Sequence, residues 1–300
     1  MATLLDCKPV AAAVKDRCRT EADALKRAGI SPKLAILRVG EKGPDLAYER
    51  GATAALTEVG IDVTVTALPV DVSQEDYIAA LKALNEDPSI HGILPFRPLD
   101  NIDEQAAITE VIDPQKDVDS GTVVNMGKTV LGDPTALTPC TAQAVLEVLD
   151  YYGIDAAGKN VCVINRSNVI GKPVSMMLIN RHATVSVCNS RTKDMEKFTE
   201  QADILVVAIP YEASVKAEWI RPGQTIIDCS VIRKKMLDEN GEPVLNEKTG
   251  KPRIQSVGCC EPAIYDMDVR ITPVPGLGGV TSALLGQNVI TAAKAQNGLI

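Results

Sequence analysis

The fold of this chain is decided by Val161-Cys162-Val163-Ile164-Asn165-Arg166-Ser167-Asn168-Val169-Ile170-Gly171-Lys172-Pro173. A short apolar run rich in β-branched residues passes through polar residues and one glycine into a helix-compatible segment, 174–178. That order is typical of a buried parallel strand followed by a tight turn and a helix. The first N–H groups of such a helix have no partner within it, and they suit the pyrophosphate of a dinucleotide. The stretch therefore predicts a cofactor loop.

The glycine pattern of this loop is incomplete. Asn165 and Ser167 stand where G-x-G-x-x-G would place its first two glycines, and only Gly171 lies near the third position. The motif is weak by itself. The surrounding segments support it, and we assign Asn165, Arg166, Ser167 and Gly171 to cofactor binding.

Strands and helices alternate on both sides of the loop. The first 130 residues alternate in this way, and from Lys159 onward strands are expected at 161–164, 183–187, 204–208 and 225–229. Such alternation predicts α/β architecture, with parallel sheets covered by helices. A chain of 300 residues is long enough for two domains. The charged segment 234–252 is expected to be an exposed hairpin.

Composition excludes several classes of function. The net charge of −8 argues against nucleic acid or an anionic membrane as the main partner. No apolar run approaches the roughly 20 residues that cross a bilayer. The N-terminus has neither the basic start nor the apolar core of a signal peptide, so we expect a cytoplasmic protein.

Cysteine placement points to reduced thiols. Of the eight cysteines, Cys162 and Cys229 fall in predicted buried strands, and Cys259-Cys260 are adjacent. There is no C-x-x-C, and the only histidines are His91 and His182. We therefore expect no metal site and a reducing, cytoplasmic location.

Short motifs follow one another in a characteristic order between Tyr48 and Gly276. They are Tyr48 with Glu58-Val59-Gly60-Ile61, Lys116-Asp117-Val118-Asp119, Thr138-Pro139-Cys140-Thr141, the cofactor loop, Ser190-Arg191-Thr192, and Thr272-Pro273-Val274-Pro275-Gly276. Together they resemble the methylenetetrahydrofolate dehydrogenase/cyclohydrolase family over nearly the whole chain.

The resemblance implies a fold and an activity. It implies an N-terminal α/β folate-binding domain, 1–140, completed by 271–300, and a Rossmann-like NAD(P)-binding domain, 141–270, with a cleft between them. Family members form homodimers and oxidise 5,10-methylenetetrahydrofolate to the methenyl form with NAD(P)+. Many also hydrolyse that product to 10-formyltetrahydrofolate.

Two departures from the family pattern concern the hydrolysis. Bifunctional members have Y-x-x-x-K, but here Tyr48 is followed four residues later by Ala52. The family glutamine of G-I-L-V-Q-L-P-L-P is replaced by Phe96, whereas the acid is retained as Asp119. Hydride removal moves no proton, whereas hydrolysis needs a group that accepts one. We therefore predict a dehydrogenase with weak or absent cyclohydrolase activity.

Three alternatives stay open. The chain is bifunctional if another group replaces the lysine, or it binds folate or nucleotide without catalysis, as its altered glycine loops suggest. A dehydrogenase for another small acid would need a base for a hydroxyl proton, and no histidine lies in the motifs.

The resemblance also implies the substrate site. Tyr48 would pack against the aromatic part of folate, and Asp119 would bind the amino edge of the pterin; both are assigned as catalytic. Phe96, Pro273 and Gly276 complete the predicted substrate site. Without the resemblance, Tyr48 would be interpreted as a half-buried core residue and Asp119 as part of a solvated loop.

Cofactor choice is predicted from the end of strand 183–187. NAD-binding units usually place an acid there for the ribose 2′-OH, but the first acid in this chain is Asp194. Ser190 and Arg191, with Arg166, would suit a 2′-phosphate instead, unless these arginines are only surface charges. We favour NADP, leave NAD open, and also assign Val231 to the cofactor.

Overall fold

The computed structural model describes residues 1–247 and 249–300, and each of two compact units has its own parallel sheet. Unit 1 is Met1–Cys7 with Val145–Gly278, and unit 2 is Lys8–Ala144 with Gly279–Ile300. The predicted α/β class, with two domains and parallel sheets, is confirmed.

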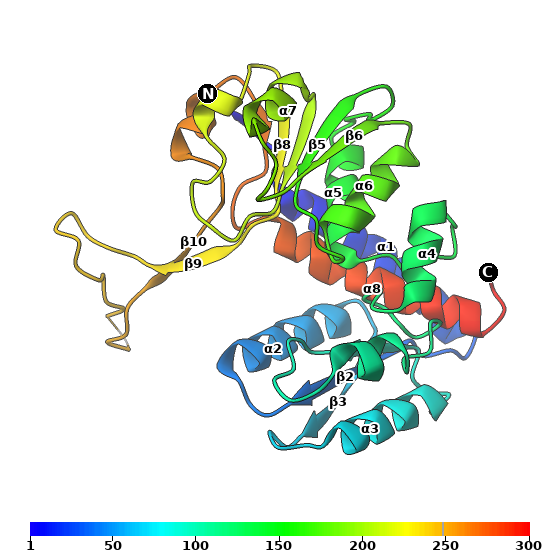
Figure 1. Cartoon of the computed structure of the whole chain (residues 1–300). Helices are drawn as coiled ribbons and strands as arrows, with labels where there is room; N and C mark the ends of the chain where they lie inside the picture. Colours follow the sequence, from blue (N-terminus) through cyan, green and yellow to red (C-terminus); the bar gives the residue numbers. More distant parts are fainter. Residues whose placement is uncertain (248) are drawn as a thin grey trace. The chain divides into compact units, whose positions relative to one another are not determined.

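Unit 2 is built on a three-stranded parallel sheet in the order β3-β2-β4 (Figure 1). The strands are β2 (Lys33–Val39), β3 (Asp62–Leu68) and β4 (Gly92–Pro95). The central strand β2 is buried almost throughout, as its apolar sequence requires. A parallel bridge between Ile93 and Asp117 adds an extended segment beside β4.

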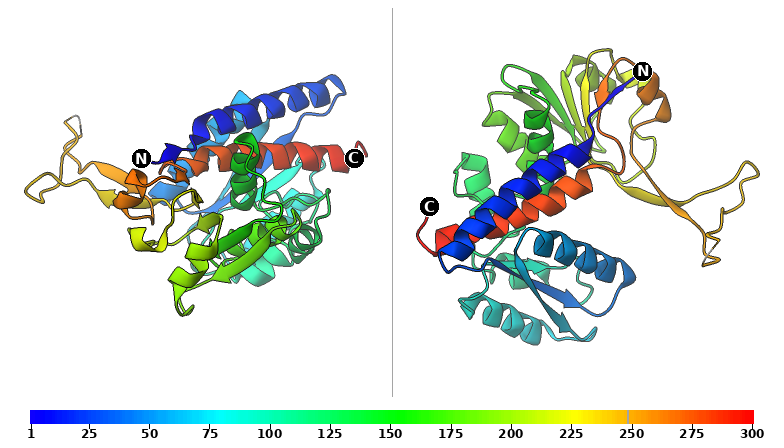
Figure 2. Two further views of the ribbon diagram at one scale, coloured as in Figure 1. Left: turned by 90° about the horizontal axis from the view of Figure 1, so that it is seen from above. Right: turned by 180° about the vertical axis from the view of Figure 1, so that it is seen from behind.

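Unit 2 also contains long helices that precede, separate and follow its strands along the chain. They are α1 (Cys7–Arg27), α2 (Gly43–Glu58), α3 (Gln74–Glu86) and α8 (Leu277–Gln296), the ends of α1 and α8 reaching into unit 1. Both views of Figure 2 show α1 and α8 side by side, and Lys294 Nζ lies 2.8 Å from a Glu21 carboxylate oxygen between them. The buried thiol of Cys18 also donates to the carbonyl of Ala283 at 3.6 Å, so segments from opposite ends of the chain pack together in unit 2.

Two helical segments of unit 2 were not predicted, the π-helix Gln105–Thr109 and α4 (Val123–Leu131). Helix α4 has an inverted pattern, since it buries Asn125 and Thr129 and exposes apolar residues such as Val123 and Leu131. The apolar periodicity of this helix therefore indicates the wrong face as the buried one.

Unit 1 contains a six-stranded parallel sheet in the order β1-β11-β8-β7-β5-β6. Its strands are β1 (Thr3–Leu4), β5 (Asn160–Ile164), β6 (Thr184–Cys188), β7 (Ile204–Val207), β8 (Thr225–Asp228) and β11 (Arg270–Ile271). Four of them match the predicted strands within one residue at each end, whereas β1 and β11 are too short to show periodicity.

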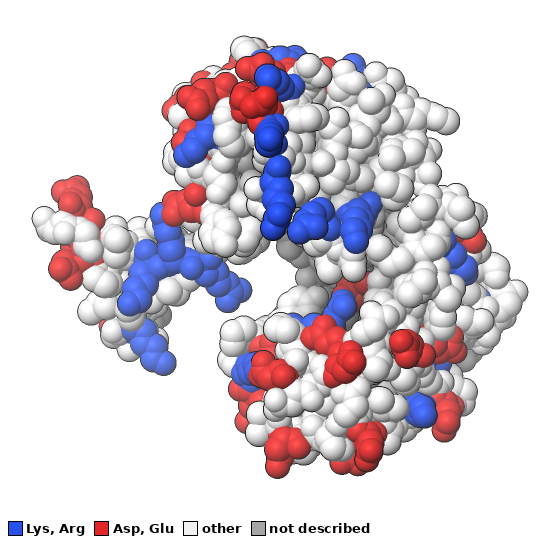
Figure 3. Space-filling model, in the orientation of Figure 1, with Lys and Arg blue, Asp and Glu red and all other residues white. Residues whose placement is uncertain are grey.

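The helices of unit 1 connect these strands, and a hairpin projects from them. The helices are α5 (Cys140–Tyr151), which begins in unit 2, α6 (Gly171–Ile179), α7 (Met195–Gln201) and two 3₁₀ turns, Ala217–Trp219 and Pro262–Asp266. Antiparallel strands β9 (Ile232–Lys235) and β10 (Ile254–Val257) form the predicted hairpin, of which Lys248 lies outside the described residues. Figure 3 shows basic side chains along the stem of this hairpin and acidic ones at its tip. Within the described part of the chain, no helix is both long and apolar enough to span a membrane.

Candidate active site

The predicted cofactor loop, 165–170, lies at the carboxyl end of β5, where the strand order of the sheet reverses. Strand β6 pairs with one edge of β5 and β7 with the other. Ligands of open α/β sheets bind at such a switch point. The side-chain amide of Asn165 donates a hydrogen bond of 2.8 Å to the carbonyl of Ala208, which joins the ends of β5 and β7.

Asn165 and Gly171 shape this loop together. The side-chain oxygen of Asn165 accepts hydrogen bonds from the N–H groups of Ser167, at 2.8 Å, and Gly171, at 3.0 Å. A Cβ at position 171 would lie 2.1 Å from the carbonyl oxygen of Asn165. The single glycine of the incomplete motif therefore stands where any side chain would collide with the loop backbone.

The expectation of unpaired N–H groups at the start of α6 is wrong for its first turn. Pro173 has no N–H, and the other donors are bonded locally: Gly171 to Asn165, Lys172 to the Ser167 carbonyl, and Val174 to the Ile170 carbonyl. In place of free N–H groups, the side chains of Arg166 and Lys172 are exposed to solvent at this loop.

The end of β6 forms a closed turn that exposes Ser190 and Arg191. Asn189 accepts the N–H of Arg191 on its side-chain oxygen at 3.1 Å, and its own N–H donates to the Thr192 hydroxyl at 2.9 Å. The nearest following acid, Asp194, is ion-paired with Lys197 at 2.7 Å. The turn thus offers a cation and a hydroxyl, with no carboxylate at the strand end.

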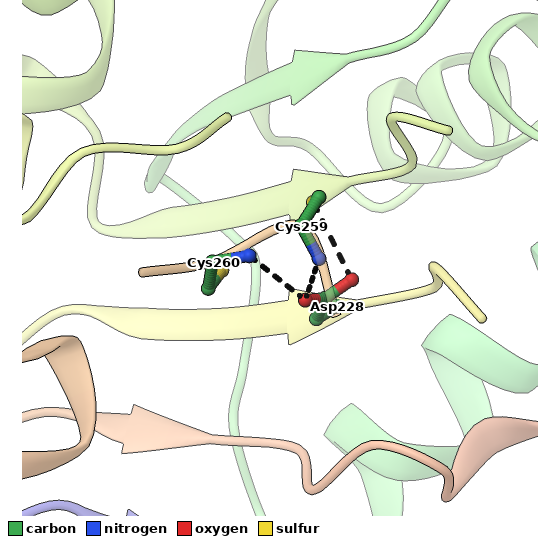
Figure 4. Close-up of side chains that lie close together, drawn as sticks. All are labelled: Asp228, Cys259 and Cys260. Carbon is green, nitrogen blue, oxygen red and sulfur yellow. Dashed lines mark hydrogen bonds between the residues drawn. The ribbon is translucent and has the colours of Figure 1, made fainter. Parts of the chain in front are cut away.

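Val231, the remaining predicted cofactor residue, is 49% exposed after β8. Its loop is fixed by the buried carboxylate of Asp228, which accepts the N–H groups of Ser230, at 2.8 Å, and of Cys259 and Cys260, at 3.0 and 3.3 Å (Figure 4). Position 258 must be glycine, because a Cβ there would lie 2.3 Å from Asp228. The segment Gly258-Cys259-Cys260 therefore packs against this carboxylate.

The same three residues raise the question of a metal ion. One ligand atom each of Asp228, Cys259 and Cys260 lies within 4.8 Å of the others, which the sequence did not predict. Metals bind the thiolate form of cysteine. Here the hydrogen bond with Cys259 and burial raise the pKa of the Cys260 thiol, and the Cys259 thiol itself donates to Asp228 at 3.5 Å. These contacts describe a hydrogen-bonded structural cluster.

In unit 2 the predicted substrate residues converge from three segments. Tyr48 lies on α2, Phe96 follows β4, and Asp119 follows the extended segment beside β4. The rings of Tyr48 and Phe96 are in contact, with centroids 5.4 Å apart and planes tilted by 58°. Arg97 Nη2 lies 3.2 Å from Asp119 Oδ2. We call these four residues the unit 2 cluster.

Asp119 is presented by a structural loop, not by the solvated loop that its sequence alone suggests. Asp117 is buried and accepts the N–H groups of Gly121 and Thr122, both at 2.8 Å. Lys116 is also buried, and its ammonium donates to the carbonyls of Leu84, Asn85 and Asp87 at the end of α3. Lys116 and Asp117 therefore hold in place the segment that carries Asp119.

Ionisation in and around the cluster is set by burial and by Asp119. Burial and the Asp119 charge raise the pKa of Tyr48 to about 12, so its phenol stays protonated at neutral pH. The same two causes hold the pKa of the buried Cys140 thiol well above its usual value. Burial also raises the pKa of Asp119, whereas Arg97 lowers it. Neither the phenol nor the thiol can serve as a base near neutral pH.

Ala52 lies on the buried face of α2, with 2% of its surface exposed, whereas Arg50 is exposed. Arg50 therefore does not take the place of the family lysine. The helix is fixed to the sheet by an ion pair between Arg38 Nε, at the end of β2, and Glu49, at 2.6 Å. Because Glu49 adjoins Tyr48, this pair anchors the turn of α2 that carries Tyr48.

The two remaining predicted substrate residues, Pro273 and Gly276, belong to unit 1. A Cβ at position 276 would lie 2.4 Å from the carbonyl oxygen of Pro273, so this turn requires glycine.

Sequence reasoning missed Arg97, although the sequence contained a signal for this residue. The family pattern quoted above has leucine where this chain has arginine.

Unit 1, with its glycine-dependent loop at a switch point, defines a dinucleotide-binding α/β protein. Comparison with known proteins agrees. Residues 5–119 match the tetrahydrofolate dehydrogenase/cyclohydrolase catalytic domain, and residues 139–297 match the NAD(P)-binding domain of the same family. The chain belongs to the tetrahydrofolate dehydrogenase/cyclohydrolase family.

Individual relatives are similar over the whole chain. Bifunctional protein FolD of Alkaliphilus metalliredigens is 40% identical over 300 residues, covering 100% of both chains. The crystal structure of the bifunctional enzyme FolD from Campylobacter jejuni is 33% identical with a TM-score of 0.87, covering 98% of this chain and 99% of that one. The Trypanosoma brucei dehydrogenase-cyclohydrolase, complexed with NADP and an inhibitor, is 32% identical with a TM-score of 0.86, covering 98% of each.

These matches confirm the predicted family and its assignment to oxidoreductase enzymes of one-carbon metabolism. An NAD(P)-binding domain is likewise confirmed. The names of the relatives agree better with the bifunctional alternative than with a dehydrogenase that lacks cyclohydrolase activity.

Proposed function

We propose that this chain oxidises 5,10-methylenetetrahydrofolate to the 5,10-methenyl form with NAD(P)+, and that its cyclohydrolase activity is weak or absent. The observation that supports this best is the make-up of the unit 2 cluster. It combines a pair of aromatic rings with an ion-paired carboxylate. Where the family pattern has lysine and glutamine, this chain has Ala52 and Phe96.

Hydride removal suits these residues. The carbon between the two nitrogens becomes a cation shared by both nitrogens, and no proton is transferred. The step needs orientation and a site that tolerates positive charge. Tyr48 and Phe96 would orient the aromatic part of the substrate, and Asp119 would accept hydrogen bonds from its pterin.

Hydrolysis of the methenyl product makes a different demand. The attacking water must lose a proton, for which a base with a pKa near the working pH is best. Tyr48 and Cys140 stay protonated, and Ala52 and Phe96 have no basic group. His91 lies before β4, at the opposite end of the strand from Phe96 and about 16 Å away along the chain.

Unit 1 would bind the dinucleotide, which when bound supplies the hydride acceptor. The fit rests on the switch-point position of the loop and on the close approach at Gly171. Because the first N–H groups of α6 are occupied, Arg166 and Lys172 would meet the phosphates. The domain division proposed from the sequence, 1–140 with 271–300 and 141–270, assigns folate to the first part and dinucleotide to the second.

The names of the relatives favour a second candidate, a bifunctional dehydrogenase/cyclohydrolase. One experiment separates the two. With methylenetetrahydrofolate and NAD+ or NADP+, absorbance of the methenyl product is expected to appear. When methenyltetrahydrofolate is supplied, we expect decay at the rate of the buffer blank. Decay well above the blank would establish the bifunctional enzyme, and lack of product with both cofactors would refute both candidates.

We propose NADP as the preferred cofactor, because the turn after β6 exposes Ser190 and Arg191 and contains no carboxylate. Replacing Arg191 with alanine is expected to raise the KM for NADP+ about 10-fold and to leave the KM for NAD+ unchanged. Lys193→Ala, which removes a neighbouring exposed cation, is the matched control. Steady-state kinetics with both cofactors decide the point, and a clear preference of the wild type for NAD+ would contradict it.

We also propose a cytoplasmic homodimer. All eight cysteines are free thiols, as expected of a protein in a reducing compartment. The dimer rests on the family resemblance alone, and light scattering of the purified chain measures it directly. A monomer at all concentrations would refute it.

A further inference from the structure

Arg97 changes the chemistry around Asp119. The family pattern has leucine at this position, and the arginine brings a guanidinium to within 3.2 Å of the carboxylate. Both side chains are 30% exposed, so the pair is neither sealed in the core nor fully surrounded by water. It is therefore accessible to a ligand.

The backbone holds both residues at the same edge of the unit 2 sheet. The N–H of Ile93 in β4 donates to the carbonyl of Lys116 at 2.7 Å, and the two segments run parallel. Arg97 follows the first segment and Asp119 the second. The N–H of Phe96 donates to the carbonyl of Leu37 at 2.8 Å, which anchors the residue before Arg97 to the central strand.

The guanidinium of Arg97 has more hydrogen-bond donors than its contact with Asp119 uses. A guanidinium carries five N–H groups in a planar fork. Among the residues that the structure describes, Asp119 is the only hydrogen-bond acceptor of this side chain. A carboxylate likewise offers about four acceptor positions on its two oxygens. The ion pair therefore leaves donors on Arg97 and acceptors on Asp119 next to each other.

Building on the proposed function, we propose that Arg97 is a second pterin-binding residue, which donates to the 4-oxo oxygen while Asp119 accepts from N3–H and the 2-amino group. The edge of a 2-amino-4-oxopyrimidine presents two donors followed by an acceptor. The pair of Asp119 and Arg97 presents acceptors followed by a donor, which is the complementary order. Charged partners make both sets of hydrogen bonds strong.

This role differs from that of the missing lysine. A guanidinium has five N–H donors and no acceptor, so Arg97 does not offer the base that the missing lysine would provide. What it can do is select the ligand. A 4-oxo group accepts its N–H, whereas a 4-amino group would place a donor against a donor. The wild type is therefore expected to discriminate between the two.

The test compares the binding of folic acid with that of its 2,4-diaminopteridine counterpart by titration calorimetry. The wild type is expected to prefer folic acid. In Arg97→Leu, which restores the family residue, we expect the Kd for folic acid to rise about 10- to 100-fold and the preference for the 4-oxo ligand to become smaller. The part that remains is due to Asp119, which accepts from N3–H in folic acid and meets an N3 without hydrogen in the diamino ligand. Arg97→Lys, which keeps the charge and loses the fork, should fall between the two.

The ratio of the two Kd values is a readout that a merely structural effect would not change. If Arg97→Leu binds folic acid as tightly as the wild type, or keeps the wild-type ratio, Arg97 only neutralises Asp119 and the proposal is wrong. Thermal melting checks folding, and the ratio in Arg97→Lys decides the matter if the leucine variant does not fold. Failure of the proposed function looks different, because the wild type itself would then bind no folic acid and form no methenyl product.

Discussion

Replacing Gly171 with alanine is expected to raise the KM for NAD(P)+ about 100-fold and to lower the free energy of unfolding by about 2–3 kcal/mol. The added Cβ would lie 2.1 Å from the carbonyl oxygen of Asn165 and 2.8 Å from the nitrogen of Arg166. Both are backbone atoms, so the collision can be relieved only if the loop moves. Such movement would disturb the contact between Asn165 and Ala208 that joins β5 to β7.

Gly127→Ala is the matched control for this variant. Position 127 lies in α4, and a Cβ there would meet no atom within 4 Å. Alanine in a helix is about 0.5–1 kcal/mol more favourable than glycine, so this variant should be slightly more stable than the wild type. Urea denaturation measures the stability of both variants, and calorimetry measures nucleotide binding. Wild-type nucleotide affinity in Gly171→Ala would show that the loop tolerates a side chain.

The main strands could be predicted because a buried parallel strand consists of apolar, β-branched residues. The run Val161 to Ile164 is apolar and β-branched, and it forms the buried strand beside the switch point. Strands β1 and β11 have two residues each, which is too short for any periodicity. Helix α4 escaped prediction because it turns Asn125 toward the network of Asp117 and leaves Val123 exposed.

The candidate site could likewise be predicted only in part. Gly171 could be singled out from the sequence because the turn between a strand and a helix demands a glycine. Partners far apart in the chain could not be foreseen from spacing. Arg97 meets Asp119 only because β4 runs beside the segment that ends there. Ser120, the residue after this acid, has a φ of +57°, a conformation that non-glycine residues seldom adopt and that no sequence pattern signals.

Restoring both family residues, as Ala52→Lys with Phe96→Gln, is expected to produce cyclohydrolase activity about 100-fold above that of the wild type or more. Positions 48 and 52 are one helical turn apart, so the new lysine lies on the Tyr48 face of α2. In the wild type only 2% of the Ala52 surface is exposed. Burial at this position lowers the pKa of a lysine toward the range of a base. The amide of glutamine at position 96 can hold the amine in place.

The same change should slow the dehydrogenase, because an added positive charge beside the substrate disfavours a cationic product. Stability should fall by about 2–4 kcal/mol, since an amine enters a buried position and the ring contact between Phe96 and Tyr48 is lost. Ala52→Met with Phe96→Gln adds similar bulk without the amine and is the control. Decay of methenyltetrahydrofolate measures the outcome. If the lysine variant folds and binds folate but hydrolyses no faster than the methionine control, Ala52 and Phe96 do not account for a missing cyclohydrolase activity, and its cause must lie in other residues of the site.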